Sequence, residues 1–395
     1  MPGTTAAALG QRIETARLAA GLTRRRLEEL SGVSYSTIRK VEVGERSPGD
    51  GVLDALARAL GRTPEDLLEG PGRTDSRVHE AIPELQRVIA AYDLPDDGPV
   101  RPLRELAADV GRVVEDRVQS QYAHLAEQVP HLLGELFRAV DQARGGVERE
   151  QAARLLALAI RSADAVAYKY GYRDLSARLV ELMRWAASIA AEPALEAAAA
   201  YVRMEIYFSA DRLGPGLRSL RAAIDRMPSP TTEPLAAAAA ALHMRAAVAA
   251  GRMRRADEAR EHLRDAEALA RRVRERLYDG TAVGPDSLEI HRLSVAVELG
   301  EPQDLRDAVA AAARWAPPQE LPAERRSHYY IDLGRAQMLL GRPQHAKESL
   351  MVARRIAPQH VREHGQVRAE LATMVRLSRG RDDQLLAFAR WARAV

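Results

Sequence analysis

The sequence predicts an all-α protein with at least two domains. Alanine, leucine and arginine dominate and only 4% of the residues are aromatic, so side-chain propensities favour helices almost throughout. No segment shows the alternation of apolar and polar residues that is typical of a half-buried strand. The length of 395 residues also exceeds the roughly 250 to 300 at which a single hydrophobic core stops growing.

The composition excludes several kinds of site. The chain has no cysteine, which removes disulfides, thiolate metal sites and cysteine nucleophiles. The N-terminus lacks the pattern of a signal peptide, and the apolar run at 234–242 is far shorter than the roughly 20 residues of a membrane helix, so we expect a cytoplasmic protein without a membrane partner. The net charge of +3 is too small to indicate a nucleic-acid partner by itself.

Residues 8–68 contain five short helical patterns separated by turn signals. The first covers 8–20 and ends at Gly21, and the second covers 24–30 after Thr23, which is a good N-cap. Helical spacing directs the following residues toward a shared core: Leu9, Ile13, Ala16, Ala20, Leu27 and Leu30.

The third helix, 34–42, follows a tight turn that Gly32 permits. Ile38 and Val41 lie three residues apart and face the core, which leaves a polar, net positive set directed elsewhere. A short helix of this kind fits a DNA major groove, which is about 12 Å wide. The loop that contains Arg46 is suited to binding phosphate, and helices at 52–60 and 64–68 close the core.

The stretch GLTRRRLEELSGVSYSTIRKVEVGERSP, followed by LDALARALGRTPEDLL, resembles the lambda-repressor-like (Xre-type) helix-turn-helix family. The resemblance implies five helices, a phosphate or base contact from Arg24, and an ion pair between Arg17 and Glu42 that ties the first helix to the third. Glu28 stands where the family usually has alanine, so it must reach solvent or an arginine. The predicted DNA-binding residues are Arg24, Tyr35, Ser36, Thr37, Arg39, Lys40 and Arg46.

The predicted partner of this domain is an operator in double-stranded DNA. The basic residues cluster around the third helix while the acidic ones come later, and a homodimer on two half-sites would add the affinity that one modestly charged domain lacks. The alternative is a helical module that docks another protein.

A linker rich in glycine, proline and polar residues at 69–76 separates this domain from the rest. We expect a DNA-binding domain at 1–70, a linker and connecting helix at 71–102, and a helical-repeat domain at 103–395 that begins with one long helix over 103–128.

The segment 329–358, YYIDLGRAQMLLGRPQHAKESLMVARRIAP, resembles a tetratricopeptide repeat at nearly every signature position. The same unit of helix, glycine turn and helix recurs more loosely, and stacked pairs of this kind form a right-handed α-solenoid with a concave inner face. The expected turn glycines of the looser units are Gly171, Gly214, Gly251, Gly300 and Gly380.

The combination of these two regions is similar to peptide-sensing quorum regulators and to a group of actinobacterial regulators. In the peptide sensors, asparagines clamp the ligand's backbone, but this chain has none, so either the clamp differs or the ligand is not an extended peptide; the expected signal is a peptide or a small molecule. The residues expected on the concave face are Arg161, Tyr168, Tyr201, Phe208 and Arg335. Two alternatives stay open: repeats that serve only for dimerisation, and a scaffold protein whose repeats bind a partner.

One motif suggests catalysis. His360-Val-Arg-Glu363-His364 matches an inverted zinc-protease pattern, with two histidines on one face of a helix, but no third ligand follows at the usual spacing. The sequence therefore predicts no enzyme, no cofactor and no metal site, and a transcription regulator in which the repeats respond to a signal.

Overall fold

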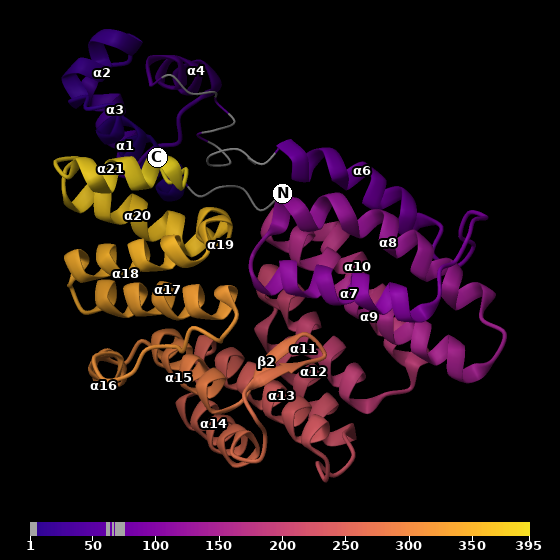
Figure 1. Ribbon diagram of the computed structural model, residues 1–395. Helices are drawn as coiled ribbons and strands as arrows, with labels where there is room; N and C mark the ends of the chain where they lie inside the picture. The colour runs from indigo at the N-terminus through magenta and orange to yellow at the C-terminus, as the bar shows by residue number, and fades with distance from the viewer. Residues whose placement is uncertain (1–5, 61–63, 65–66, 68–75) are drawn as a thin grey trace. The chain divides into compact units, whose positions relative to one another are not determined.

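The computed structural model describes residues 6–60, 64, 67 and 76–395 (Figure 1). The described residues are almost entirely helical, as the sequence predicts. The chain divides into two compact units, and the first of them combines both ends of the sequence: unit 1 contains Met1–Thr74 and Val361–Val395, and unit 2 contains Asp75–His360.

Unit 1 has an N-terminal core built on helices at nearly the predicted positions. Leu27, Ile38 and Val41 are buried in it, and Leu67 joins them from the segment of the predicted fifth helix, which otherwise lies mostly outside the described residues. The inward orientation expected for Ala20 and Leu30 is wrong, because both are exposed. The N-terminal helices are α1 (Ala6–Ala19), α2 (Arg24–Ser31), α3 (Tyr35–Glu42) and α4 (Asp50–Ala59).

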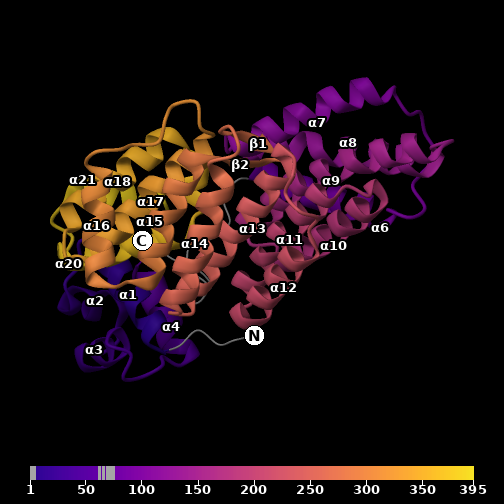
Figure 2. The same cartoon turned by 90° about the horizontal axis from the view of Figure 1, so that it is seen from below.

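The last two helices of the chain, α20 (Gly365–Leu377) and α21 (Asp383–Trp391), also belong to unit 1. α20 contacts α1 and lies beside it in both views (Figures 1 and 2). At Gly380, a Cβ atom would lie 3.0 Å from the carbonyl oxygen of Leu18, so the C-terminal turn approaches α1 closely. This grouping differs from the predicted division, in which all of 103–395 forms one repeat domain, because packing against α1 determines where these helices belong.

Unit 2 begins with α6, which packs on α8, so the segment expected to be a connecting helix is part of the repeat unit. The predicted single helix over 103–128 is wrong: Ser120 adopts a left-handed backbone (φ 60°), and the chain turns back there. The helices that lie wholly within unit 2 are α6 (Ser76–Ala90), α7 (Leu103–Val118), α8 (Tyr122–Gln142), α9 (Gly146–Lys169), α10 (Arg173–Ala190), α11 (Pro193–Ser209), α12 (Leu213–Arg226), α13 (Glu233–Arg252), α14 (Ala256–Ala270), α15 (Pro285–Leu299), α16 (Pro302–Ala312), α17 (Ala323–Leu339) and α18 (Pro343–Ile356). The short α19 (Pro358–Glu363) crosses the boundary between the units.

The helix pairs confirm the helical-repeat class, and the best-matched pair shows why its small residues are needed. A Cβ atom on Gly334 of α17 would lie only 3.2 Å from Leu350 of α18, so glycine lets the two helices cross closely. Two of the predicted turn glycines are misplaced: Gly214 and Gly251 lie inside helices, and the left-handed turn residues beside them are Asp211 and Arg254.

The first helices of successive pairs form an inner layer within unit 2. α9 contacts α11, α11 contacts α13, α13 contacts α15, and α15 contacts α17 (Figure 1). α17 also contacts α7, and the backbone N–H of Ala123 donates a hydrogen bond to Gln359 Oε1 at 3.1 Å, so the layer curves back toward its start. By length and composition alone α13 is long and apolar enough to cross a membrane, but 72% of its apolar stretch is buried inside the protein.

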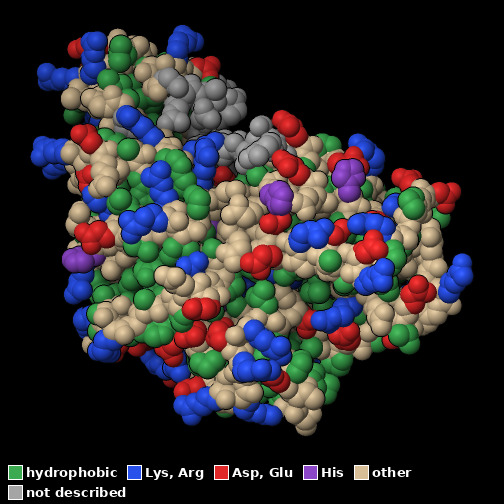
Figure 3. Space-filling model, viewed as in Figure 1, with side chains coloured by type: hydrophobic (Ala, Val, Ile, Leu, Met, Phe, Trp, Pro, Cys, Tyr) green, Lys and Arg blue, Asp and Glu red, His purple; other side chains and the backbone are tan. Residues whose placement is uncertain are grey.

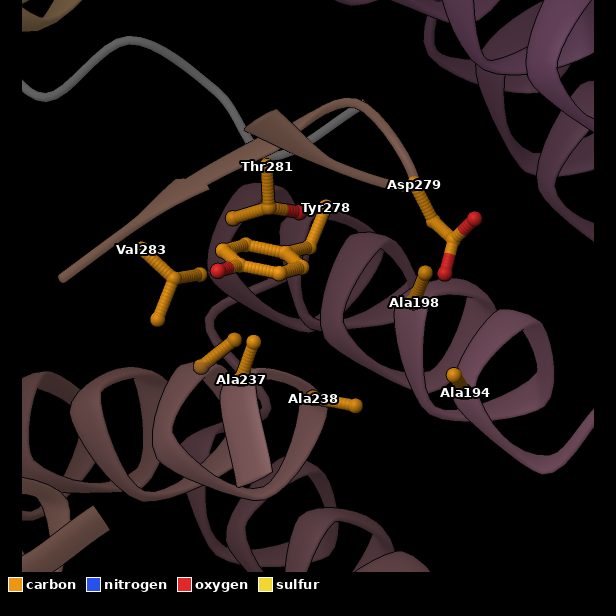
Figure 4. A pocket seen from close by; sticks show the side chains of 9 residues that line it. Ala194, Ala198, Ala237, Ala238, Tyr278, Asp279, Thr281 and Val283 are labelled. Carbon is orange, nitrogen blue, oxygen red and sulfur yellow. The ribbon is translucent and has the colours of Figure 1, made fainter. Parts of the chain in front are cut away.

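A β-hairpin, which is not among the predicted elements, lies against this inner layer. Strand β1 (Arg276–Tyr278) pairs antiparallel with β2 (Thr281–Val283) through the two-residue turn Asp279-Gly280, where both residues have positive φ. Such a turn favours an Asp-Gly pair because its backbone twist matches that of the strands. In Figure 4, Tyr278, Thr281 and Val283 face the alanine-lined surfaces of α11 and α13. The pocket there has an accessible volume of ≈ 10 Å³, about enough for one water molecule.

Candidate functional site

Helix α3 buries one face and presents a polar face to solvent. Ile38 and Val41 are fully buried, whereas Tyr35 is 42% exposed. Thr37 is half-buried, and the other predicted reading residues that face solvent are Ser36, Arg39, Lys40 and, in the following loop, Arg46.

Two side chains fix the N-terminus of α3. The Ser34 hydroxyl accepts a hydrogen bond from the backbone N–H of Thr37 at 3.3 Å, and Glu28 Oε1 accepts one from the backbone N–H of Tyr35 at 2.8 Å. Glu28, expected to reach solvent or an arginine, is half-buried at the surface and also reaches this backbone N–H. Its carboxylate caps α3, where the positive end of the helix dipole favours a negative charge.

A buried ion cluster joins α1, α2 and α3. Arg17 Nε lies 2.6 Å from Glu42 Oε1, and Arg24 Nε lies 2.6 Å from Glu42 Oε2. The side chain of Glu42 is completely buried and that of Arg17 is only 6% exposed. The Arg17–Glu42 pair thus ties α1 to α3, and it shares its carboxylate with Arg24, a predicted DNA contact.

The ion cluster already fixes the Arg24 side chain in the absence of a ligand. Partial burial lowers its pKa, but the hydrogen bond and charge of Glu42 outweigh that effect and raise the pKa above its ordinary value. Its Nη2 also lies 3.3 Å from Glu14 Oε1. The guanidinium is therefore fixed in orientation at the N-terminal end of α2.

The other cations near α3 are less constrained. Arg39 has an acidic neighbour, Glu45, at 3.6 Å, and Arg26 pairs with Glu29 at 2.6 Å on an exposed surface. Among the described residues, neither Lys40 nor Arg46 forms an ion pair. Basic side chains project from the α1–α4 end of the view in Figure 3.

A second candidate site lies on the inner layer of unit 2. It is an arginine–tyrosine cluster formed by Arg117 of α7, Arg161 of α9, Tyr201 of α11, Arg245 of α13 and Arg325 of α17. Arg325 Nη2 donates to the Tyr201 hydroxyl at 2.9 Å, and the Arg245 guanidinium lies 3.8 Å from the centre of the Tyr201 ring. Side chains from five different helices, counting that of Tyr201 itself, therefore lie close together in this cluster.

The cluster holds more positive than negative charge. Among the described residues, only Arg245 has a carboxylate within ion-pairing distance, Glu205 at 3.3 Å. Burial, and then the charge of Arg117, lower the pKa of Arg161 below its ordinary value. Burial raises the pKa of Tyr201, but Arg245 and Arg325 outweigh this and bring it below its ordinary value. Burial lowers the pKa of Arg325, but Tyr201, Glu324 and Glu275 outweigh this effect and raise it, so nearby carboxylates partly balance the cations.

The tip of the β-hairpin enters this cluster. Arg161 Nη1 donates to the Asp279 carbonyl oxygen at 2.5 Å and to Thr281 Oγ1 at 2.8 Å, and Arg117 donates to the Gly280 carbonyl oxygen. Arg117 Nε finds no hydrogen-bond acceptor among the described residues, although it is buried. These two guanidinium groups thus donate to neutral carbonyl and hydroxyl oxygens of the hairpin.

The structure brings four of the five predicted ligand contacts to this region. Arg161 lies 5.8 Å from the Tyr201 ring centre, and Arg245 lies 5.8 Å from that of Phe208. Burial, and then the nearby charge of Glu205, raise the pKa of Tyr168 to about 12. The fifth residue is engaged elsewhere: Arg335 pairs with Glu298 at 3.1 Å and with Asp332 at 3.0 Å.

Sequence reasoning missed the remaining members, Arg117, Arg245 and Arg325. Arginine is so abundant in this chain that no local pattern distinguishes them. The hairpin that reaches them did have a signal, the Asp279-Gly280 pair between short apolar segments.

The zinc-protease motif does not form as the sequence suggested. α19 ends at Glu363, and His364 is the N-cap residue of α20, so the two histidines do not share one continuous helix. His360 is buried, and its Nδ1 is hydrogen-bonded to Ser327.

Comparisons with known proteins bear on the N-terminal region. Residues 13–67 match the family model described as helix-turn-helix. No curated protein matches the chain. The similar solved structures include Bacillus thuringiensis PlcR in complex with the peptide PapR7 and DNA, which is 15% identical, covers 66% of this chain and 93% of its own, and has a TM-score of 0.30.

Two further structures are of the competence regulator ComR. The apo form from Streptococcus vestibularis is 11% identical, covers 89% of this chain and 99% of its own, and has a TM-score of 0.28. ComR from Streptococcus suis is 13% identical, covers 87% and 94%, and has a TM-score of 0.18. The family match and the geometry of α2 and α3 together identify the N-terminal part of this chain, residues 13–67, as a helix-turn-helix domain.

Proposed function

We propose that this protein is a sequence-specific DNA-binding transcription regulator whose repeat unit responds to an anionic effector. The observation that carries the proposal is the division of α3 into a buried face, with Ile38 and Val41, and an exposed face, with Tyr35 and Lys40. With its side chains an α-helix is about 10 to 12 Å in diameter, so α3 can lie in a major groove about 12 Å wide.

Within this proposal the residues of α3 have different tasks. Tyr35, Ser36 and Thr37 occupy its first turn, the part of a recognition helix that reaches base edges. Lys40 lies one turn further along and is free to reach either a base or a phosphate. Arg39 and Arg46 flank the helix and would contact the DNA backbone, which adds affinity without sequence information.

Arg24 and Glu28 stabilise the position of α3 through contacts with its residues. The Glu42 carboxylate holds Arg24, which keeps 29% of its side chain exposed for a phosphate. Glu28 fixes the first turn of α3 through the Tyr35 N–H. A preformed reading helix loses little conformational entropy on binding.

We further propose that the protein acts in the cytoplasm as a homodimer on paired half-sites. A single domain with few unpaired cations gains little from counterion release, so two domains on one operator would supply the missing affinity. The half-sites would then lie about 34 to 36 Å apart, one helical turn of DNA, or a multiple of that distance.

The arginine–tyrosine cluster supports the effector part of the proposal. Buried cations without carboxylate partners are unfavourable, and an incoming carboxylate would neutralise them. The chemical class is therefore a peptide or small molecule with at least one carboxylate, next to aromatic surface from Phe208 and Tyr168. Since the chain has no asparagine, arginine and tyrosine would make the polar contacts with the ligand.

The hairpin would move when such an effector binds. The carbonyl groups of Asp279 and Gly280 accept hydrogen bonds from Arg161 and Arg117, so a ligand that binds these guanidinium groups would replace them. Binding then changes DNA affinity only if the ligand prefers one arrangement of the protein over the other.

The test is selection of DNA from a random pool with the full-length protein, followed by fluorescence anisotropy with the enriched sequence. Tyr35→Ala combined with Lys40→Ala should abolish the preference for that sequence. The matched control is Arg104→Ala, which removes one charge from an 85% exposed side chain of α7 and should change nothing.

Salt dependence separates the two kinds of contact. If Lys40 contacts a phosphate, Lys40→Ala should lower the slope of log affinity against log salt by about 1. If no sequence is enriched from the pool, the protein is not a sequence-specific DNA reader, and the scaffold alternative takes its place.

A further inference from the structure

Three side chains that could act as metal ligands converge within the α13–α14 helix pair, far along the chain from the helix-turn-helix domain. They are His243 of α13 and His262 and Asp265 of α14, and one ligand atom from each lies within 4.8 Å of those of the others. The two histidine Nδ1 atoms are 3.1 Å apart, and His243 Nδ1 is 3.5 Å from Asp265 Oδ2.

These separations match the geometry of a small transition-metal ion. With metal–ligand bonds of about 2.0 to 2.1 Å and tetrahedral angles, neighbouring ligand atoms lie about 3.3 Å apart. His262 and Asp265 are three residues apart on one helix and therefore share a face, and His243 approaches them from the facing helix. An ion could enter without rearrangement of the two helices.

The surroundings provide both enclosure and access. His262 is 9% exposed and the His243 side chain 13%, so the imidazoles are held by packing, whereas the Asp265 side chain is 51% exposed and opens the group to solvent. Glu261 lies near enough for its charge to act on both histidines, which adds negative potential for a cation.

We propose that His243, His262 and Asp265 bind a divalent first-row transition-metal ion, with Zn²⁺ as the best fit. Two imidazole nitrogens and one carboxylate oxygen suit zinc, cobalt or nickel, whereas calcium and magnesium require mainly oxygen ligands. Three protein ligands leave a fourth position for water or for a donor from a bound molecule. The ion would link the two helices of a repeat pair in the middle of unit 2.

The competing explanation is a simple hydrogen bond between the two imidazoles, in which one Nδ1–H donates to the other Nδ1. The experiment that decides uses the full-length protein, stripped with a chelator and dialysed. ZnCl₂ is titrated into it by isothermal calorimetry, and CoCl₂ is added as a spectroscopic probe. Because the chain has no cysteine, thiolate bands cannot obscure the visible spectrum of Co²⁺.

The wild-type protein should bind one more equivalent of Zn²⁺ than His243→Ala. Asp265→Asn, at an exposed position that does not threaten folding, should weaken this site by at least the roughly 10- to 100-fold that loss of an outer-shell partner costs. The matched control is His131→Ala, at an exposed histidine of α8, which should bind as the wild type does. Comparing the number of Zn²⁺ equivalents bound by the wild type and the variants distinguishes this site from any other metal site of the chain.

Thermal melting supplies a second readout that does not depend on the calorimeter. Excess Zn²⁺ should raise the melting temperature of the wild type and of His131→Ala more than that of Asp265→Asn, since a ligand that binds only the folded state stabilises it. Equal numbers of equivalents and equal affinities in the wild type, His243→Ala and Asp265→Asn would overturn the proposal and leave the imidazole hydrogen bond as the explanation.

Discussion

The two units differ in whether their arginine side chains are exposed or buried. Around α3 in unit 1, Arg39 and Arg46 face solvent, whereas Arg117 and Arg161 in unit 2 are buried on the inner layer. Exposed cations can follow an extended polyanion, and buried ones can only neutralise a group that enters the fold. Arginine content alone therefore does not indicate a partner, but the surroundings of each guanidinium do.

The largest effect is expected when the carboxylate of the buried Arg17–Glu42 ion pair in unit 1 is removed. Glu42→Ala leaves Arg17 buried without its carboxylate, and breaking a buried pair in this way costs about 3 to 5 kcal/mol. Native-state hydrogen exchange of the α1 and α3 amides measures the loss within the full-length protein.

The matched control for this variant is Glu45→Ala, whose carboxylate is 54% exposed and lies 3.6 Å from Arg39. An exposed pair contributes about 0 to 1 kcal/mol, so exchange should hardly change. Equal exchange rates in the two variants would mean that burial does not distinguish these arginines.

A smaller effect is expected where the hairpin meets the inner arginines. Gly280→Ala places a side chain on a residue with φ of 75° and sets its Cβ 2.8 Å from Arg117 Nη2. Backbone strain of this kind costs about 1 to 3 kcal/mol, and the displaced guanidinium adds to the loss. Hydrogen exchange of the amides at 276–283 should accelerate accordingly.

Gly341→Ala provides the matched comparison, because its φ is 72° but nothing lies within 4 Å of the added Cβ. The difference between the two losses then reports the contacts of the added Cβ with Arg117 and, at 3.5 Å, with Arg161 Nη1. If both glycines cost the same, the hairpin tip does not press on the arginine–tyrosine cluster.

The smallest expected effect is a pH dependence of the contact between Glu233 and the hairpin residue Tyr278. Hydrogen bonds from Arg274 and then Tyr278 lower the pKa of Glu233 to about 2, from an ordinary value of 4.5. A carboxylate whose pKa is lowered on folding stabilises the folded state above pH 4.5 and loses that contribution as the pH falls toward 2. The NMR signals of ¹³C-labelled Tyr278 should therefore shift over this interval, and Glu233→Gln should remove the transition. A transition that survives the substitution would assign it to another group.

The parts of the fold that local chemistry determines were predictable. Gly32 and Ser34 mark the turn and cap of α3, and the spacing of Ile38 and Val41 gives its buried face. Gly334 likewise marks the close crossing of α17 and α18.

The parts that depend on distant contacts were not predictable. Ser120 interrupts a continuous amphipathic pattern without glycine or proline, and Leu30 occupies a helical core position yet is 49% exposed. The arginine–tyrosine cluster joins five helices, and His243 meets His262 only because α13 packs on α14. Neither group has a signature at fixed sequence spacing.

The contact between α20 and α1 has a consequence for how the protein is made. α20, which covers one side of α1, follows it in the chain only after the whole of unit 2, so α1 is translated well before this partner. Since synthesis adds about 5 to 20 residues per second, the nascent chain waits tens of seconds or less with that side of α1 uncovered. A copy whose translation stops before α20 therefore lacks the helix that covers this side of α1.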